Sequence, residues 1–173
     1  MLRMHGPSCD LPMRALLLAV LMTMLSGCSL LRDSPPDFPR RTVPSSAPLP
    51  DNAGGALVGV ASQFIGSPYR YGGMTPRGFD CSGLVHYTHD LIGREVPRTA
   101  REQSRAARSV DVDDLEPGDL VFFRISSRKV DHVGIYAGDG RFIHAPSTGG
   151  AVTYGYLDDP YYRRHFTRAG RLW

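Results

Sequence analysis

The chain has 173 residues, of which 42% are hydrophobic and 21% are charged, and its formal net charge is +3. A chain of this length and composition can bury the core of one ordinary domain with residues to spare. From Gly54 onward there are 15 basic and 13 acidic residues. This near balance argues against a nucleic-acid-binding protein, which would carry a strongly basic surface.

The first 27 residues have the pattern of a secretory signal peptide. The positively charged Arg3 and Arg14 come first, an apolar run follows over residues 15–25, and small residues come after it. The apolar run is too short to span a bilayer comfortably as a permanent helix. We therefore expect residues 1–27 to be removed on export.

The sequence Leu25-Ser26-Gly27-Cys28 resembles a bacterial lipobox, in which the cysteine is acylated and becomes the new N-terminus. A coincidental cleavage site is the alternative, because small residues precede many such sites. Several acyl chains on Cys28 would anchor the protein stably in a membrane. The resemblance also implies a sorting rule by which Ser29 after this cysteine, rather than Asp, favours the outer membrane, so we expect a lipoprotein that faces the periplasm of a Gram-negative bacterium.

A proline-rich segment separates this anchor from the rest of the chain. Residues 28–53 contain six prolines interleaved with Ser, Asp and Arg. Such a stretch cannot bury a core, so we expect an extended tether. The globular domain is then predicted over residues 54–173.

Cys81 is the one thiol expected to stay free in the mature protein. Cys9 leaves with the signal peptide and Cys28 is lipidated, so no intramolecular disulfide can form, although an exported protein could carry one. Cys81 follows Asp80 at the start of an apolar run that predicts a helix. Unpaired N–H groups at a helix start favour the thiolate. The alternative is a small buried hydrophobe.

The predicted elements are helices first and strands afterwards. Apolar spacing and capping residues predict helices over 56–65, 81–92 and 99–107. Strands are predicted over 119–123, 130–137, 141–145 and 151–154. This order predicts an α+β domain with N-terminal helices packed on an antiparallel β-sheet. Cys81 would lie in the helical layer.

His132 and His144 each lie in an apolar strand of the predicted sheet. A thiol nucleophile needs a base within hydrogen-bond reach, and that base needs a third group to hold its ring. A two-residue turn at 139–140 would place the two histidines on opposite faces of the sheet. A three-residue loop at 138–140 would place them on one face, with Cα atoms roughly 7–8 Å apart. Joint action therefore predicts the three-residue loop, with Gly140 in the left-handed conformation.

Five segments resemble the NlpC-type cysteine peptidases of bacterial cell walls. In chain order they are GSPYRYGG (66–73), GFDCSGLV (78–85), PGDLVFF (117–123), DHVGIY (131–136) and FIHAP (142–146). The resemblance implies a papain-like cysteine peptidase fold and hydrolysis of peptide bonds in peptidoglycan. No catalytic position departs from the pattern.

The resemblance also assigns roles by motif position. It implies that Cys81 is the nucleophile, His132 the general base and His144 the residue that orients His132. It further implies that Tyr69 stabilises the oxyanion beside the backbone N–H of Cys81. Neither a cofactor nor a metal ion is expected, and the protein is expected to be a monomer.

Three neighbours of Cys81 are candidate substrate-binding residues. Asp80 and Ser82 could bind an amine or a carboxylate of the stem peptide, but N-capping explains Asp80 equally well. Arg77 could face the carboxylates of diaminopimelate or glutamate, with a solvated loop as the alternative. His86 and His89 share a helix face, but they lack further ligands in a recognised pattern, so no metal site is predicted.

The predicted function is thiol-dependent cleavage of murein, the bacterial peptidoglycan. The bond between D-alanine and diaminopimelate in a crosslink is favoured, and the bond between γ-D-glutamate and diaminopimelate is the alternative. The competing hypothesis is a catalytically silent peptidoglycan-binding lipoprotein; a thiol acyltransferase on a related fold is a third. The presence of Cys81, His132 and His144 favours the enzyme. The expected partners are peptidoglycan and outer-membrane lipid, and no nucleic acid.

Overall fold

The computed structural model describes residues 52–148 and 150–173. The predicted signal peptide, Cys28 and nearly all of the predicted tether lie outside the described residues. No helix within them is long and apolar enough to cross a membrane. The elements in chain order are α2 (Ala53–Ser62), β1 (Met74–Thr75), β2 (Gly78–Phe79), α3 (Cys81–Leu91), α4 (Ala100–Ala106), β3 (Arg108–Val110), the 3₁₀ turn η1 (Val112–Asp114), β4 (Leu120–Phe123), β5 (His132–Gly138), β6 (Arg141–His144), β7 (Thr153–Tyr156), α5 (Pro160–His165) and β8 (Phe166–Arg171).

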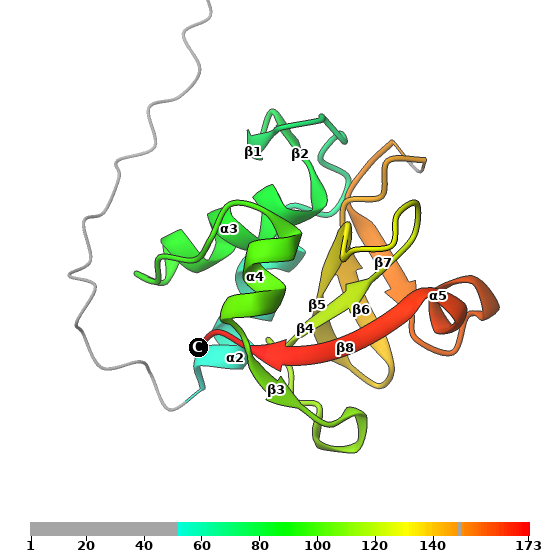
Figure 1. Cartoon of the computed structure of the whole chain (residues 1–173). Coiled ribbons are helices and arrows are strands. Elements are labelled where there is room, and N and C mark those ends of the chain that lie inside the picture. Colours follow the sequence, from blue (N-terminus) through cyan, green and yellow to red (C-terminus); the bar gives the residue numbers. More distant parts are fainter. Residues whose placement is uncertain (1–51, 149) are drawn as a thin grey trace, which may run out of the picture. The chain divides into compact units, whose positions relative to one another are not determined.

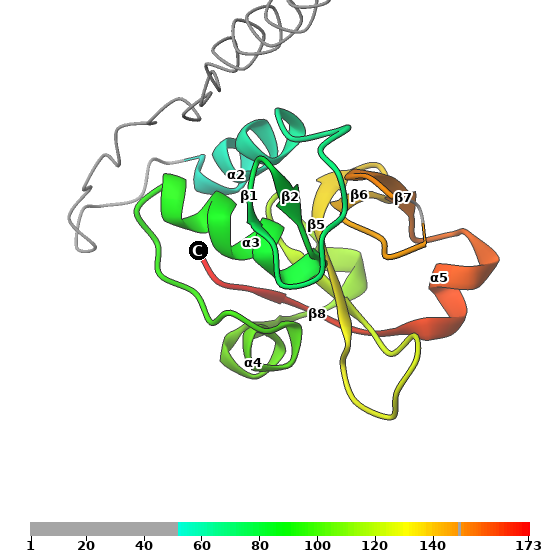
Figure 2. The same ribbon diagram turned by 90° about the horizontal axis from the view of Figure 1, so that it is seen from above.

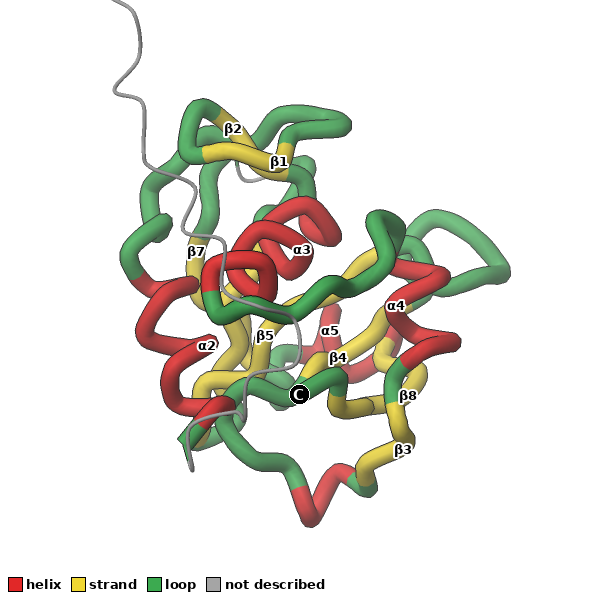
Figure 3. Tube along the Cα trace, turned by 90° about the vertical axis from the view of Figure 1, so that its left-hand side faces the viewer, coloured by secondary structure: helices red, strands yellow, loops and turns green. Residues whose placement is uncertain are grey.

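The centre of the domain is a six-stranded antiparallel sheet with the order β3-β8-β4-β5-β6-β7. Helices α2, α3 and α4 lie on one side of this sheet and α5 lies on the other (Figure 1). The short hairpin of β1 and β2 lies over α3 (Figure 3). The predicted α+β class, with N-terminal helices on an antiparallel sheet, is confirmed.

Each face of the sheet has its own apolar core. Alternation along the strands sends Phe122, Val133 and Ile143 toward the helices and Phe123 and Phe142 toward α5. The helix-side core is the larger and is completed mainly by α2 and α3, with buried Ala61, Leu84 and Val85. The core on the α5 side is smaller and mostly aromatic.

The start of α3 is set by local chemistry, as predicted. The Asp80 side chain caps the helix by accepting a hydrogen bond from the backbone N–H of Gly83 at 2.6 Å. A Cβ atom at position 83 would collide with the backbone oxygen of Gly73. Glycine is therefore required where the 71–73 loop lies against the first turn of α3, two residues after Cys81.

The turn between β5 and β6 corrects one prediction. Asp139 and Gly140 have φ angles of 52° and 71°, and Gly138 pairs with Arg141, so the loop has two residues and not three. A bulge at Ala137 then shifts the register by one residue. The bulge restores the pairing that a three-residue loop would have given, and both histidines face the same side of the sheet.

Strand β8 was not predicted, although it lies between β3 and β4. Arg168 and Arg171 interrupt the apolar alternation that would predict this strand, but in the folded domain each of them has bonding partners. Arg171 forms an ion pair with the fully buried Asp119, with Nε and Oδ1 2.6 Å apart. Arg168 donates to the backbone oxygens of Ser104 and Ala107. Seen from above, β8 runs from α5 to the C-terminal end of the chain (Figure 2).

Candidate active site

Cys81 is the first residue of α3, and two adjoining pockets share it. One pocket contains Tyr69, Cys81, Asp131 and His132, and the other contains Tyr69, Cys81, Asp131 and Arg98. The sulfur of Cys81 lies 3.9 Å from the backbone oxygen of Asp131. The thiol therefore lies between the helix start and the residue that precedes His132.

The histidines of β5 and β6 form a bonded pair. Nε2 of His132 lies 2.8 Å from Nδ1 of His144, and the two rings are nearly perpendicular, at 84°. One nitrogen must donate and the other accept in a neutral pair. When Nε2 of His132 donates, its Nδ1 keeps a free lone pair, and His132 lines the pocket that contains Cys81. This tautomer can accept a proton from a thiol.

Burial keeps the resting groups uncharged. It raises the pKa of the Cys81 thiol to about 11, with a further rise from the Asp80 carboxylate that nearby backbone N–H groups partly oppose. Burial also lowers the pKa of His132, against the opposing influence of Asp131, and lowers that of His144, where His132 adds to the effect. The helix start therefore does not by itself produce a thiolate. At neutral pH the site holds a thiol beside a neutral imidazole.

Tyr162 extends the histidine pair, a position that no pattern in the sequence predicts. Its hydroxyl lies 3.4 Å from Nε2 of His144, on the side of the ring opposite His132. Its ring meets those of His144 and Phe142 edge to face. Nε2 of His144 can donate to this hydroxyl when its Nδ1 accepts from His132. The polar chain thus runs from His132 through His144 to α5.

Tyr69 reaches the site from the loop before β1. Its backbone N–H donates to the oxygen of Gly150, and an isolated bridge pairs it with Phe79. The side chain borders both pockets that contain Cys81. Burial raises the pKa of the Tyr69 hydroxyl, and Cys81 adds to this rise, so the hydroxyl keeps its proton and can donate it in a hydrogen bond.

The same arrangement of sequence and fold is found in known proteins. Residues 66–171 match the model of the NlpC/P60 family. The chain belongs to the NlpC/P60 family. This is a family of cysteine peptidases. The matched region contains Cys81, Tyr69 and both histidines of the bonded pair.

Several bacterial proteins resemble this chain. Murein DD-endopeptidase MepH of Escherichia coli is 48% identical over 115 residues, covering 64% of this chain and 42% of MepH. The E. coli protein named murein DD-endopeptidase MepS/murein LD-carboxypeptidase is 42% identical over 108 residues, covering 62% of this chain and 56% of its own length. The probable endopeptidase NlpC of E. coli is 39% identical over 165 residues, covering 92% of this chain and 100% of that protein. The chain thus spans less than half of MepH and all of NlpC.

Solved NlpC/P60 structures share the fold. The family member from Bacillus cereus has a TM-score of 0.67 and 36% sequence identity, covering 72% of this chain and 41% of the other. The similarity therefore extends from the motifs to the arrangement of helices and sheet.

In this NlpC/P60 domain the carboxylate of Asp80 is fully engaged. It accepts from the N–H groups of Gly83 and Gly72 and forms an ion pair with Arg98, whose Nη2 lies 2.6 Å from Oδ2. The hydroxyl of Ser82 lies 3.2 Å from Asp80 Oδ1 and 2.9 Å from Nη1 of Arg98. N-capping of α3 by Asp80 is thereby confirmed, and Arg98 is a pocket residue that the sequence did not single out.

The remaining candidates lie elsewhere in the domain. Arg77 is exposed at the turn between β1 and β2, and the pockets beside Cys81 are lined by other residues. His86 and His89 bond separately, through Nδ1, to the backbone oxygens of Val96 and Val85. No group of three metal-binding side chains occurs among residues 52–148 and 150–173.

Asp131 was also missed by sequence reasoning as a site residue. Its carboxylate accepts from the backbone N–H groups of Ile125 and Ser126 at 2.7 and 2.8 Å. These bonds outweigh the effect of burial and lower the pKa of the carboxyl, so Asp131 stays charged beside His132. The carboxylate of Asp131 holds the 124–131 loop through these hydrogen bonds. Its negative charge also stabilises an imidazolium at His132 when one forms.

Proposed function

We propose that this protein is a peptidoglycan hydrolase that uses Cys81 to cleave peptide bonds in murein. The observation that carries the proposal is the bonded histidine pair, in which His132 lines the pocket that contains the thiol and keeps one ring nitrogen free to accept a proton. A nucleophile, a base and a group that holds the base are the parts that thiol catalysis requires. Membership of a cysteine peptidase family supports the same reaction.

The first step joins proton transfer to attack. His132 accepts the proton of the Cys81 thiol at Nδ1 while the sulfur attacks the carbonyl carbon of the scissile bond. Because the thiol and the imidazole are both neutral at rest, the transfer is driven by bond formation to the substrate. The hydroxyl of Tyr69 and the backbone N–H of Cys81 stabilise the oxyanion. Asp131 and His144 stabilise the imidazolium.

The second step releases both products. The imidazolium of His132 gives its proton to the leaving amine as the carbon–nitrogen bond breaks, which leaves an acyl thioester on Cys81. His132 then removes a proton from water, and the resulting hydroxide attacks the thioester carbon. Collapse of the resulting tetrahedral intermediate breaks the carbon–sulfur bond and frees the carboxylic acid, and the imidazolium of His132 returns its proton to the sulfur to restore the thiol.

The favoured bond joins D-alanine to diaminopimelate in a murein crosslink. The similarity to MepH and MepS, both named murein DD-endopeptidases, supports this choice. The ion pair between Asp80 and Arg98 also supports the crosslink bond as the substrate. A carboxylate that is already ion-paired is a poor ligand for the free amine of a stem peptide. The γ-D-glutamyl bond to diaminopimelate is the second candidate.

Digestion of purified sacculi tests the proposed reaction. Wild-type protein and Cys81→Ala are incubated with sacculi, and the soluble and muramidase-released muropeptides are identified by mass. Loss of crosslinked dimers with wild type alone supports the crosslink endopeptidase, whereas loss of intact stems supports γ-glutamyl cleavage. Identical profiles from both proteins would favour the silent peptidoglycan-binding lipoprotein.

We further propose that Cys28 carries lipid and that residues 28–53 tether the peptidase domain to the outer membrane. The lipobox-like sequence before Cys28 and the six prolines after it support this organisation. Cells grown with labelled palmitate should label the wild-type protein and not Cys28→Ala. Fractionation should recover the labelled protein with outer membranes, and equal labelling of both proteins would refute the anchor.

A further inference from the structure

A surface groove next to the active site is lined by five positively charged side chains. They are Arg101 and Arg105 of α4, Arg124 after β4, and Arg128 and Lys129 of the following loop. Ser104, Val130 and Thr167 complete its lining. All five cationic residues are exposed. We call this feature the basic groove.

The charges of the basic groove have no carboxylate partners within the described residues. The ion pairs found there join Arg98, Arg141 and Arg171 to acidic side chains. Like charges held this close repel one another, and a bound polyanion would remove the repulsion. The basic groove therefore has the electrostatic character of an anion-binding site.

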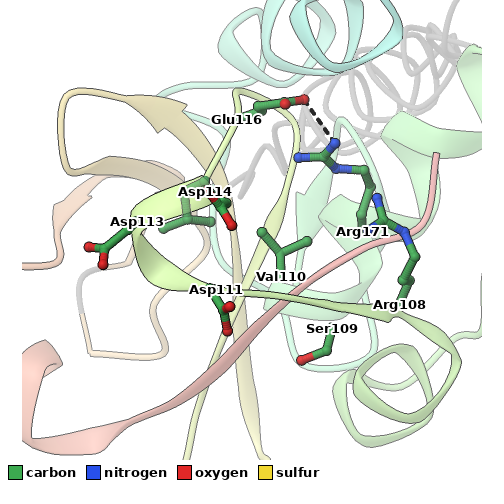
Figure 4. A pocket seen from close by; sticks show the side chains of 9 residues that line it. Arg108, Ser109, Val110, Asp111, Asp113, Asp114, Glu116 and Arg171 are labelled. Atoms are coloured by element: carbon green, nitrogen blue, oxygen red, sulfur yellow. Dashed lines mark ion pairs between the residues drawn. The ribbon is translucent and has the colours of Figure 1, made fainter.

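In a second depression of this domain, the charges of the arginines are balanced by acidic side chains. It contains Arg108 and Arg171 together with Asp111, Asp113, Asp114 and Glu116 (Figure 4). Glu116 and Arg171 form an ion pair at 2.8 Å. Arginines are thus placed among acidic residues in one depression and apart from them in the other.

The basic groove continues into the catalytic pocket. Arg101 and Val130 line both the groove and the pocket that contains Cys81 and Tyr69. An extended ligand that places one bond at Cys81 can therefore follow the surface past Arg101 into the groove. This continuity favours a segment of the substrate over an unrelated ligand.

We propose that the basic groove binds free carboxylates of murein stem peptides, beyond the residues that flank the scissile bond. This inference rests on the proposed function. Stem peptides retain a free carboxylate at D-glutamate and at diaminopimelate, so a crosslinked pair presents several within a short length. Arginine binds carboxylates with two parallel hydrogen bonds. The groove would thereby favour crosslinked, carboxylate-bearing peptides over neutral ones.

Binding measurements test this proposal apart from catalysis. In the Cys81→Ala protein, the double substitution Arg105→Gln and Arg128→Gln should raise the Kd for a purified crosslinked muropeptide dimer about tenfold. Neither residue belongs to the catalytic machinery, and Arg124 is left intact because its Nε bonds Thr167. Arg108→Gln removes an exposed charge outside the groove and should leave the Kd unchanged.

The chemical control is the same dimer with its free carboxylates converted to amides. The groove substitutions should not alter the Kd for the amidated dimer, and added salt should weaken binding of the acidic dimer less in the double variant. An equal loss with both peptides, an equal loss in Arg108→Gln, or no loss at all would overturn the proposal. Circular dichroism and thermal unfolding of each variant verify that the fold is intact.

Two further outcomes separate this proposal from its alternatives. If wild type releases no product from sacculi while the carboxylate-dependent Kd difference is found, the proposed catalysis fails and the anion site stands. Vesicles with phosphatidylglycerol, compared with phosphatidylcholine alone, test a lipid surface as the ligand. If the double variant loses vesicle binding and keeps its affinity for the dimer, the basic groove is a membrane-binding surface and the proposal is wrong.

Discussion

Two places in the domain bury histidines: the adjoining ends of strands β5 and β6, and helix α3. The exposed fractions are 7% for His132, 1% for His144 and 0% for His89, and burial lowers the pKa of all three. His132 and His144 bond each other beside the pocket of Cys81, whereas Nδ1 of His89 donates to the oxygen of Val85 within its own helix. A buried histidine with a lowered pKa is therefore not in itself catalytic. Access to a nucleophile makes the difference.

The largest expected effect is the difference in activity between substitutions at the histidine pair and its nucleophile and a substitution at His89. His132→Ala and Cys81→Ala should each lower kcat/KM for cleavage of a crosslinked muropeptide by about 10³-fold or more, because each removes a reacting group. His89→Leu should leave kcat/KM nearly unchanged. Product formation followed by chromatography and mass gives the rates. A comparable loss in His89→Leu, with the fold intact by circular dichroism, would contradict the distinction.

The next effect concerns the group that holds the base. His144→Ala should lower kcat by about 10²-fold with little change in KM, because His132 loses the acceptor that fixes its ring and tautomer. His144→Asn should recover part of this loss, since an amide oxygen can accept the same hydrogen bond. Steady-state kinetics of both variants check this. Equal activities for the Ala and Asn variants would show that the acceptor is not what matters.

A third effect concerns stability and uses His89. Its pKa is lowered to about 4 by burial, so the unfolded chain binds a proton at a pH where the folded protein does not. The contribution of neutral His89 to the free energy of unfolding is thus fully present above pH 6.5. It is lost as the pH decreases from 6.5 toward 4, by up to about 3 kcal/mol for a shift of this size. His132 and His144 act in the same direction.

Urea unfolding between pH 7 and pH 4 measures this loss. His89→Leu should remove one of the contributions and make the free energy of unfolding less dependent on pH, while its activity at pH 7 persists. The control is wild type in the same buffers at constant ionic strength. Parallel pH curves for wild type and His89→Leu would show that His89 does not supply this dependence.

The smallest effect is expected at Tyr162. Its hydroxyl is 3.4 Å from His144, a long and weak contact, and its ring packs against Phe142. Tyr162→Phe keeps the ring and should lower kcat by about threefold, with KM and the thermal midpoint nearly unchanged. The variant should also alter the pH dependence of kcat, because the hydroxyl bonds the histidine pair. A change in the midpoint without a change in kcat would make the residue purely structural.

Local signals predicted a large part of the fold. The N-caps at Asp80 and Thr99 and the apolar runs of β4, β5 and β6 depend on neighbouring residues, and all are present. Strands β3 and β8 and helix α5 were not predicted. Arginines in β8 obscure its pattern, and α5 has six residues, too few to show a helical period.

The amino-acid sequence by itself determined that a lone thiol begins a helix and that two histidines follow in apolar strands, because capping and hydrophobic periodicity act over a few residues. Only the tertiary structure decided that a bulge at Ala137 would turn both histidines to one face. It also decided that Tyr162 would reach His144 and that Arg98 would neutralise Asp80. These contacts join residues far apart in the chain, so their geometry depends on how the helices and the sheet pack. The raised pKa of Cys81 has the same origin, since burial is a property of the folded domain.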